Sequence, residues 1–311
     1  MRVTSNTFPS SLLNQLTTLT ARQSQLQTQA ATGQTIQSPE DDPTAMRRVL
    51  DLQAENNSVA QYQRNISRHQ ELASVTFDSV KALKKISDRA SEIVISADGL
   101  KSKQELTVYA TEVSELIKQA VQIANTKNRG DFIFGGTQTD KSPFTAALDS
   151  SGQVTKVDYQ GNTTVPETEI AEGVTVSAQV PGANTSGSGT TGLITDSRTG
   201  ADLFNHLISL QQHLAAGDSK TIAETDRAQL GKDEENLLFH LSSNGAIQAR
   251  LEASSAKLSQ RSLALNGLVS KEADADLAQT IVKLQQTQTA YQAALQSGSM
   301  LLNRSLLDYL R

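Results

Sequence analysis

The strongest indication of the fold lies in residues 277–306, which read LAQTIVKLQQTQTAYQAALQSGSMLLNRSL. Steps of three and four residues connect its apolar positions, and such steps return to one face of a helix. The positions on this seam are Leu277, Ile281, Leu284, Tyr291, Leu295, Gly298, Leu302 and Leu306, with Gln288 completing the spacing. Because only Lys283 and Arg304 are charged, the helix is poorly suited to face water alone. The pattern therefore predicts a helix that packs against a partner.

A matching seam occupies the N-terminal end of the chain. Its members repeat the same steps around one polar residue, Gln23, and no acidic residue precedes Glu40. They are Leu12, Leu16, Leu19, Leu26, Ala30 and Gly33. We therefore expect residues 1–43 and 272–311 to pair as an antiparallel coiled coil that forms a terminal assembly domain.

The composition favours slender helical packing over a thick core, because aromatic residues make up only 4% of the 311 residues and tryptophan is absent. A formal net charge of -5 makes nucleic acid and an anionic membrane surface poor partners. The sequence contains neither a long apolar run that could span a membrane nor the order of a cleaved signal peptide. The absence of cysteine excludes disulfides, thiol catalysis and cysteine-bound metal.

Helical patterns continue on both sides of the middle of the chain. After Asp41, the pair Asp42-Pro43 has the chemistry of a helix start, since aspartate caps well and proline suits the first helical position. Residues 44–98 contain neither glycine nor proline, and a second helical run should end near Gly130. Helical spacing returns in residues 201–271, with a stop at Gly217. We expect residues 44–130 and 201–271 to form a rod domain of long helices.

Residues 131–200 have a different composition, because they hold ten of the eighteen glycines and three of the six prolines. Strands are predicted at residues 132–134, 154–159 and 174–180, the last with clean alternation of apolar and polar residues. The Gly/Ser/Thr-rich residues 182–200 are expected to form a flexible loop. The overall prediction is a mainly α protein, a long antiparallel helical bundle formed by both chain ends, with a small β-rich surface insertion in the middle.

Catalytic or metal-binding chemistry has little support in the sequence. His206 and His213 lie two helical turns apart, about 10 Å by helical rise, which is too far to share one metal. Residues 187–192 match the letters of a dinucleotide-binding fingerprint but lack the surrounding strand and helix. We therefore expect no enzyme activity, no cofactor and no metal site.

Several motifs in the right order resemble the flagellin superfamily, and within it the hook-filament junction proteins. They are the start MRVTS at residues 1–5, the loop TGQTIQSPEDDPTA at 32–45, the segment NRGDFIFGGT at 128–137 and the ending SLLDYL at 305–310. The resemblance covers nearly the whole chain. Filament flagellins share the paired terminal helices, but they usually have a different sequence at the turn formed here by Asp41, Asp42 and Pro43.

The resemblance implies a structural protein of the bacterial flagellum that serves motility. Such a protein is secreted unfolded through the flagellar type III export apparatus, and its terminal helices self-assemble into a ring. Its implied partners are other copies of itself, the first hook-associated protein, flagellin and a cytoplasmic export chaperone that recognises the C-terminal region. Filament flagellin remains an alternative, as does a soluble coiled-coil adapter, although an adapter should carry charges beside its seams.

Overall fold

The computed structural model describes residues 7–97, 99 and 101–309, and the side chains of residues 10–97, 99 and 101–300. The chain is mainly helical with a small strand-containing middle region, as the sequence predicts. It forms two compact units. The terminal unit comprises Met1–Ser58 and Arg261–Arg311, and the central unit comprises Val59–Gln260. Two long helices, α2 (Pro43–Ser96) and α6 (Arg227–Ala273), contribute residues to both units.

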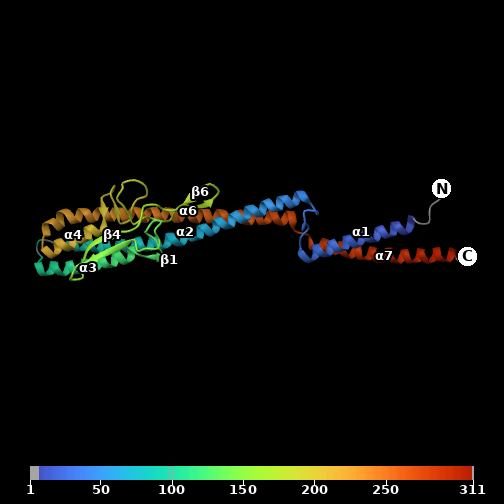
Figure 1. Cartoon of the computed structure of the whole chain (residues 1–311), viewed down its shortest axis with the longest axis horizontal. Helices are drawn as coiled ribbons and strands as arrows, with labels where there is room; N and C mark the ends of the chain where they lie inside the picture. The colour runs from blue at the N-terminus through green and yellow to red at the C-terminus, as the bar shows by residue number, and fades with distance from the viewer. Residues whose placement is uncertain (1–6, 98, 100, 310–311) are drawn as a thin grey trace. The chain divides into compact units, whose positions relative to one another are not determined.

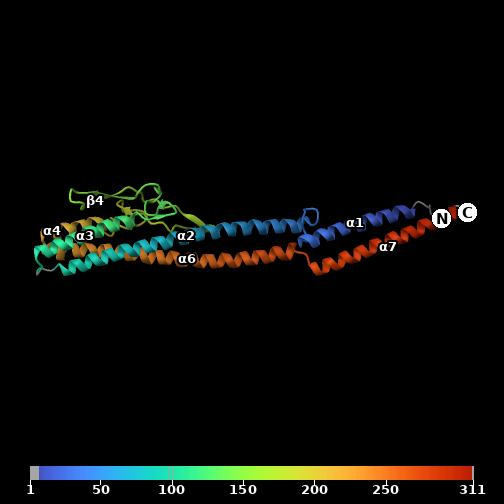
Figure 2. The same cartoon turned by 90° about the horizontal axis from the view of Figure 1, so that it is seen from below.

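In the terminal unit, helix α1 (Thr7–Thr32) lies beside helix α7 (Leu277–Tyr309), as Figures 1 and 2 show. Gln34 forms an antiparallel β-bridge with Asp274 at the base of the pair. The N–H of Ala275 donates a hydrogen bond of 2.8 Å to the carbonyl of Gly33. Gly33 ends α1 with φ of 72°, a conformation that favours glycine. These contacts confirm that the two chain ends pair as antiparallel helices.

The ends of α2 and α6 that belong to the terminal unit are joined by polar contacts. Arg48 lies 2.7 Å from Glu272, and Arg261 lies 2.6 Å from Glu55. These side chains are partly exposed, so each ion pair contributes at most about 1 kcal/mol. Deeper in this part of the unit, Leu265 is fully buried. The ion pairs therefore fix the register of the two helices, while burial stabilises them.

In the central unit, α3 (Lys103–Ala124) and α4 (Leu203–Ala216) lie beside α2 and α6 (Figures 1 and 2). Buried side chains from all four helices form one core with side chains of the strands. The predicted stop of α4 at Gly217 is confirmed, with φ of 78°. Helix α3 ends earlier than predicted, at Ala124, and Gly130 instead lies in the turn between strands β1 (Lys127–Asn128) and β2 (Asp131–Phe132).

The strands form small sheets that lie mainly in the predicted insertion. Strand β3 (Phe144–Leu148) pairs with β4 (Val154–Tyr159), and β5 (Thr168–Ala171) pairs with β6 (Val174–Val176), both antiparallel. Strands β7 (Ala183–Asn184), β8 (Thr195–Asp196) and β9 (Ala201–Asp202) form a three-stranded sheet. The prediction for residues 154–159 is confirmed, whereas only the first three of residues 174–180 form a strand. A short helix α5 (Ser219–Thr221) and a π-helix η1 (Ile222–Asp226) precede α6.

The motif at residues 132–137 forms a tight turn against the loop that follows β4. Gly136 has φ of 66°, and a Cβ atom there would collide with the backbone oxygen of Asn162. The Tyr159 hydroxyl donates a hydrogen bond to the Phe134 carbonyl, 2.9 Å away. Glycine is therefore required at position 136 by both conformation and space.

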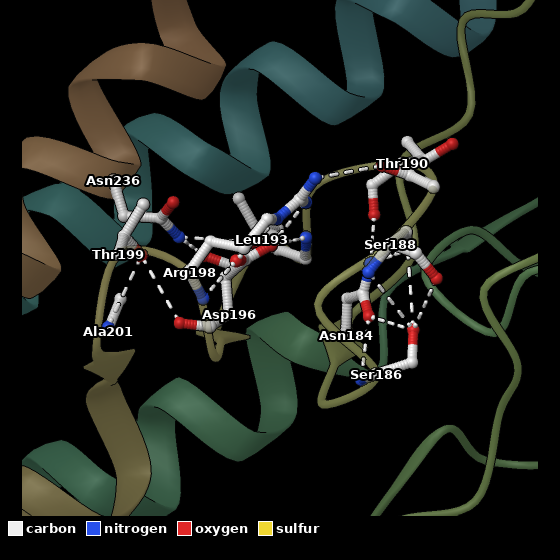
Figure 3. Close-up of polar contacts among 12 residues, drawn as sticks. Asn184, Ser186, Ser188, Thr190, Leu193, Asp196, Arg198, Thr199, Ala201 and Asn236 are labelled. Carbon is white, nitrogen blue, oxygen red and sulfur yellow. Dashed lines mark hydrogen bonds and ion pairs between the residues drawn. The ribbon is translucent and has the colours of Figure 1, made fainter.

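The loop expected to be flexible is held by the polar contacts in Figure 3. The fully buried carboxylate of Asp196 accepts hydrogen bonds from the Gly192 N–H at 2.9 Å and from Arg198 Nη2 at 2.7 Å. The Arg198 guanidinium is the main cause that lowers the pKa of Asp196 to about 2. Asn184 Nδ2 donates to the carbonyls of Ser188 and Thr190, both at 2.7 Å. Residues 184–198 are thus an ordered polar loop.

Candidate assembly surface

The N-terminal seam lies on the side of α1 that faces α7. Leu26 is buried, and Leu12, Leu16 and Leu19 are half-buried, while most residues between them are exposed. This alternation follows the steps of three and four residues, because those positions return to one helical face. We call these four leucines the inner face of α1.

On α7 the residues turned towards α1 include smaller and more polar side chains than the sequence suggested. Leu284 and Tyr291 are half-buried as members of the predicted seam. Beside them, Thr280 and Thr287 are each only 7% exposed, and Ala294 is half-buried. Sequence reasoning missed these three positions because it followed large apolar residues. Their spacing of seven residues is the signal that could have found them.

The two helices approach each other closely at Gly298. A Cβ atom added to Gly298 would lie 2.5 Å from Leu12 Cδ2, closer than side-chain atoms normally approach. The absence of a side chain on Gly298 therefore makes room for the leucine. This contact fixes the register of α1 against α7 near the far end of the described pair.

Three predicted seam residues are less covered than the rest of the described seam. Leu277 and Ile281 are each 47% exposed, and Leu295 is 45% exposed. At 100° per residue they fall within about 40° of one another around α7, next to the half-buried positions. We call these three residues the outer stripe. The single predicted seam of α7 is thus divided into a more buried part and the more exposed outer stripe, because one neighbouring helix covers only part of a wide apolar face.

The final two predicted seam residues, Leu302 and Leu306, lie in α7, but their side chains are outside the described residues. Other exposed hydrophobic side chains accompany the outer stripe in the terminal unit. They are Leu13, Leu50, Leu263, Leu268, Val282 and Met300. Arg22 is the only charged residue of α1. Helices α1 and α7 therefore present apolar side chains with few charges to oppose their burial, whereas Leu50, Leu263 and Leu268 lie on the more highly charged helices α2 and α6.

The helix-start loop forms as its residue types suggest. Asp42 Oδ1 accepts hydrogen bonds of 2.9 and 3.0 Å from the backbone N–H groups of the first turn, and Pro43 begins α2. Asp41 Oδ2 accepts bonds of 3.0 Å from the N–H groups of Gln37 and Ser38. The Gln37 hydrogen bond is the main cause that lowers the pKa of Asp41. These contacts fix the direction in which the chain leaves α1 and enters α2.

Two of the histidines, His206 and His213, pair with buried carboxylates in the central unit. His206 Nδ1 lies 2.8 Å from Asp233 Oδ2, and His213 Nδ1 lies 2.8 Å from Asp226 Oδ2. Both carboxylates are fully buried, so the imidazoles satisfy groups that would otherwise lack partners. Among the described residues, no three potential metal ligands cluster together. The same part of the chain contains no helix long and apolar enough to cross a membrane.

Comparison with known proteins relates both the sequence and the fold to flagellar proteins. Residues 3–139 match the family described as the bacterial flagellin N-terminal helical region. No curated protein matches the sequence.

Solved structures with a similar fold have low sequence identity. A flagellar hook-associated protein from Vibrio parahaemolyticus has a TM-score of 0.64 and 21% identity, covering 75% of this chain and all of its own. FlgL from Xanthomonas campestris has a TM-score of 0.57 and 13% identity, covering 69% of this chain and 98% of its own. FlgL from Bacillus cereus has a TM-score of 0.55 and 19% identity, covering 71% and 99%. Residues 3–139 are therefore similar to the flagellin N-terminal helical region, and the chain has the fold of these flagellar hook-associated and FlgL structures.

Proposed function

We propose that this chain is a structural subunit of the bacterial flagellum that joins the hook to the filament. The flagellin N-terminal region and the fold shared with FlgL structures support a flagellar role. The resemblance of the motifs at both chain ends to hook-filament junction proteins supports the specific position. In this role the subunit forms a ring, contacts the first hook-associated protein on one side and flagellin on the other, and performs no catalysis.

The outer stripe is the observation that carries this proposal, because α1 leaves it uncovered. Its occupant would be a terminal helix of a neighbouring copy, whose surface has the same sparse charge. Leu277, Ile281 and Leu295 are each about half exposed, so covering them contributes about 1 kcal/mol each. Contacts of about 3 kcal/mol per stripe, repeated around a ring, stabilise an assembly while leaving each single contact weak.

Export and assembly impose opposite requirements on the terminal helices. Secretion through the flagellar type III apparatus requires an unfolded chain, and a cytoplasmic chaperone would cover the C-terminal region before export. Two helices that bury few large side chains between them unfold at low cost. Burial of the outer stripe after export would then couple folding to assembly.

Immunogold electron microscopy of intact flagella tests the position of the subunit. An antibody against residues 131–200 should label a narrow band between hook and filament, and a strain lacking the protein should show no band. Label along the whole filament would instead identify a filament flagellin, the alternative that the matched flagellin region favours. Absence of flagellar label despite normal protein levels would favour a soluble coiled-coil adapter.

A further inference from the structure

The central unit contains a cavity of about 300 Å³ between α2 and the β5–β6 hairpin. Two hydrogen bonds hold the hairpin over the helices. Asn65 Nδ2 on α2 donates to the Glu169 carbonyl at 2.8 Å, and Arg250 Nη2 on α6 donates to the Thr175 carbonyl at 3.2 Å. The walls include Asn65, Arg68, His69, Leu72, Thr168 and Gln179. Because the hairpin is anchored to both helices, the cavity is a built feature of the fold.

Polar groups at this cavity lack partners among the described residues. His69 is only 8% exposed, and its Nδ1 atom has no hydrogen-bond partner there. Gln179 Oε1 is also buried and also has no hydrogen-bond partner among the described residues. Arg68 is exposed, and its guanidinium forms no ion pair or hydrogen bond with any residue that the structure describes, although its charge helps to lower the pKa of Glu71. Buried polar atoms without partners destabilise a fold, and rotation of the His69 and Gln179 side chains would bring these covered atoms to a polar occupant of the cavity.

The protonation state of His69 limits which kinds of ligand can bind in the cavity. Burial, together with the neighbouring charge of Arg68, lowers the pKa of His69. The imidazole is therefore neutral at pH 7 and has one donor and one acceptor nitrogen. Arg68 then remains the single cation of the cavity, which suits one carboxylate better than a multiply charged phosphate.

We propose that the cavity binds a hydroxylated carboxylic acid of monosaccharide size, such as a uronic acid. Its carboxylate pairs with Arg68, and its hydroxyl groups exchange hydrogen bonds with His69 and Gln179 after small side-chain rotations. Hydroxyls suit these partners because each can donate and accept. Leu72 provides an apolar wall for the C–H face of the ring. A volume of about 300 Å³ is at the small end of ligand pockets and accommodates one sugar ring.

A second, more open hollow extends from the cavity and supports an anionic ligand. It shares Asn65 and Arg68 with the cavity and adds Arg64 and Arg129 to its walls. Arg129 is paired with Glu71, so Arg64 and Arg68 supply the positive charge beside the entrance, which raises the local concentration of anions. The hollow also leaves room for the next unit of an acidic polysaccharide. This site is independent of the proposed role in the flagellum, because it lies in the central unit.

Calorimetry and NMR titration of the full chain with D-glucuronate test the proposal. D-glucose has similar hydroxyls without the charge, and acetate has the charge without the hydroxyls. We expect saturable binding of glucuronate, with a shift of the His69 imidazole signals, and binding of glucose and acetate at least about tenfold weaker. Arg68→Gln should weaken glucuronate binding about tenfold or more, as expected for a lost charge-assisted hydrogen bond.

The matched control is Arg64→Gln, which removes an arginine one helical turn away that lines the open hollow but not the cavity. It should weaken binding less than about threefold, the effect of a distant charge. Gln179→Leu should reduce the preference for glucuronate over acetate. Three outcomes would overturn the proposal: equal binding of glucose and glucuronate, equal losses of affinity in the two arginine variants, or no saturable shift of the His69 signals. The absence of a His69 shift would mean that water alone fills the cavity.

Discussion

Substituting Leu295 by aspartate should separate folding of the subunit from its assembly. Leu295 is 45% exposed, so in the isolated chain the change costs about 0.5 kcal/mol of helix propensity and about 1 kcal/mol for the half of the side chain that is already covered. In the proposed ring the same position is covered by a neighbour. Losing its burial costs about 1 kcal/mol, and an unpaired carboxylate in an apolar contact costs about 3 kcal/mol or more. The sum of about 4 kcal/mol weakens each contact about a thousandfold.

The matched control is Gln286→Asp, which places the same charge on an exposed position of α7 far around the helix from the outer stripe. Circular dichroism should show equal helix content in both variants. Immunoblots of purified flagella should detect Gln286→Asp at the wild-type level and little or no Leu295→Asp. A third variant, Leu284→Asp, should already loosen the α1–α7 pair in the monomer, because Leu284 faces α1. Wild-type incorporation of Leu295→Asp would refute the assignment of the outer stripe to a subunit contact.

Three further predictions concern the stability of the chain. The pKa of Asp196 is lowered to about 2, so the ionised carboxylate contributes at most about 2 kcal/mol to the free energy of unfolding above pH 3.8. This contribution is lost as the pH falls from 3.8 towards 2. Amide hydrogen exchange around the loop should therefore accelerate in this pH window in the wild type but not in Asp196→Asn. Gly136→Ala should lower the melting temperature more than Gly130→Ala. Both glycines have positive φ, but only Gly136 lacks space for a Cβ atom. Equal decreases in melting temperature would contradict this steric argument. Asp233→Ala should destabilise the central unit by about 1–3 kcal/mol in denaturant unfolding, whereas Asp233→Asn, which keeps one acceptor oxygen, should cost less.

Local chemistry made several features predictable from sequence. The end of α4 at Gly217 and the start of α2 at Asp42-Pro43 depend on residues within one turn of the boundary, so short-range rules suffice. Spacing alone identifies Leu12, Leu16, Leu19 and Leu26 as the leucines of α1 that are less exposed than most residues between them. The division of the α7 seam could not be predicted, because periodicity gives the width of an apolar face but not which side of it a neighbour covers.

The polar interior was less predictable, because its partners are distant in sequence. His206 and Asp233 are 27 positions apart, and their contact depends on how α4 packs against the start of α6. The same limit explains the wrong expectation of a flexible loop around Asp196. Gly, Ser and Thr are typical of mobile linkers, but a single buried carboxylate can organise such a segment by accepting several hydrogen bonds.

The two units differ in how completely they bury their apolar side chains. The core of the central unit takes side chains from four helices and several strands, and many of its large residues are fully buried. In α1 and α7, by contrast, Leu26 is the only large apolar side chain described as buried. Two helices can each cover only one side of the other, so an apolar face wider than that contact remains exposed in an isolated subunit. The helices at both ends of the chain thus keep apolar faces with few charges beside them, and in the proposed ring the terminal helices of neighbouring copies would cover these faces.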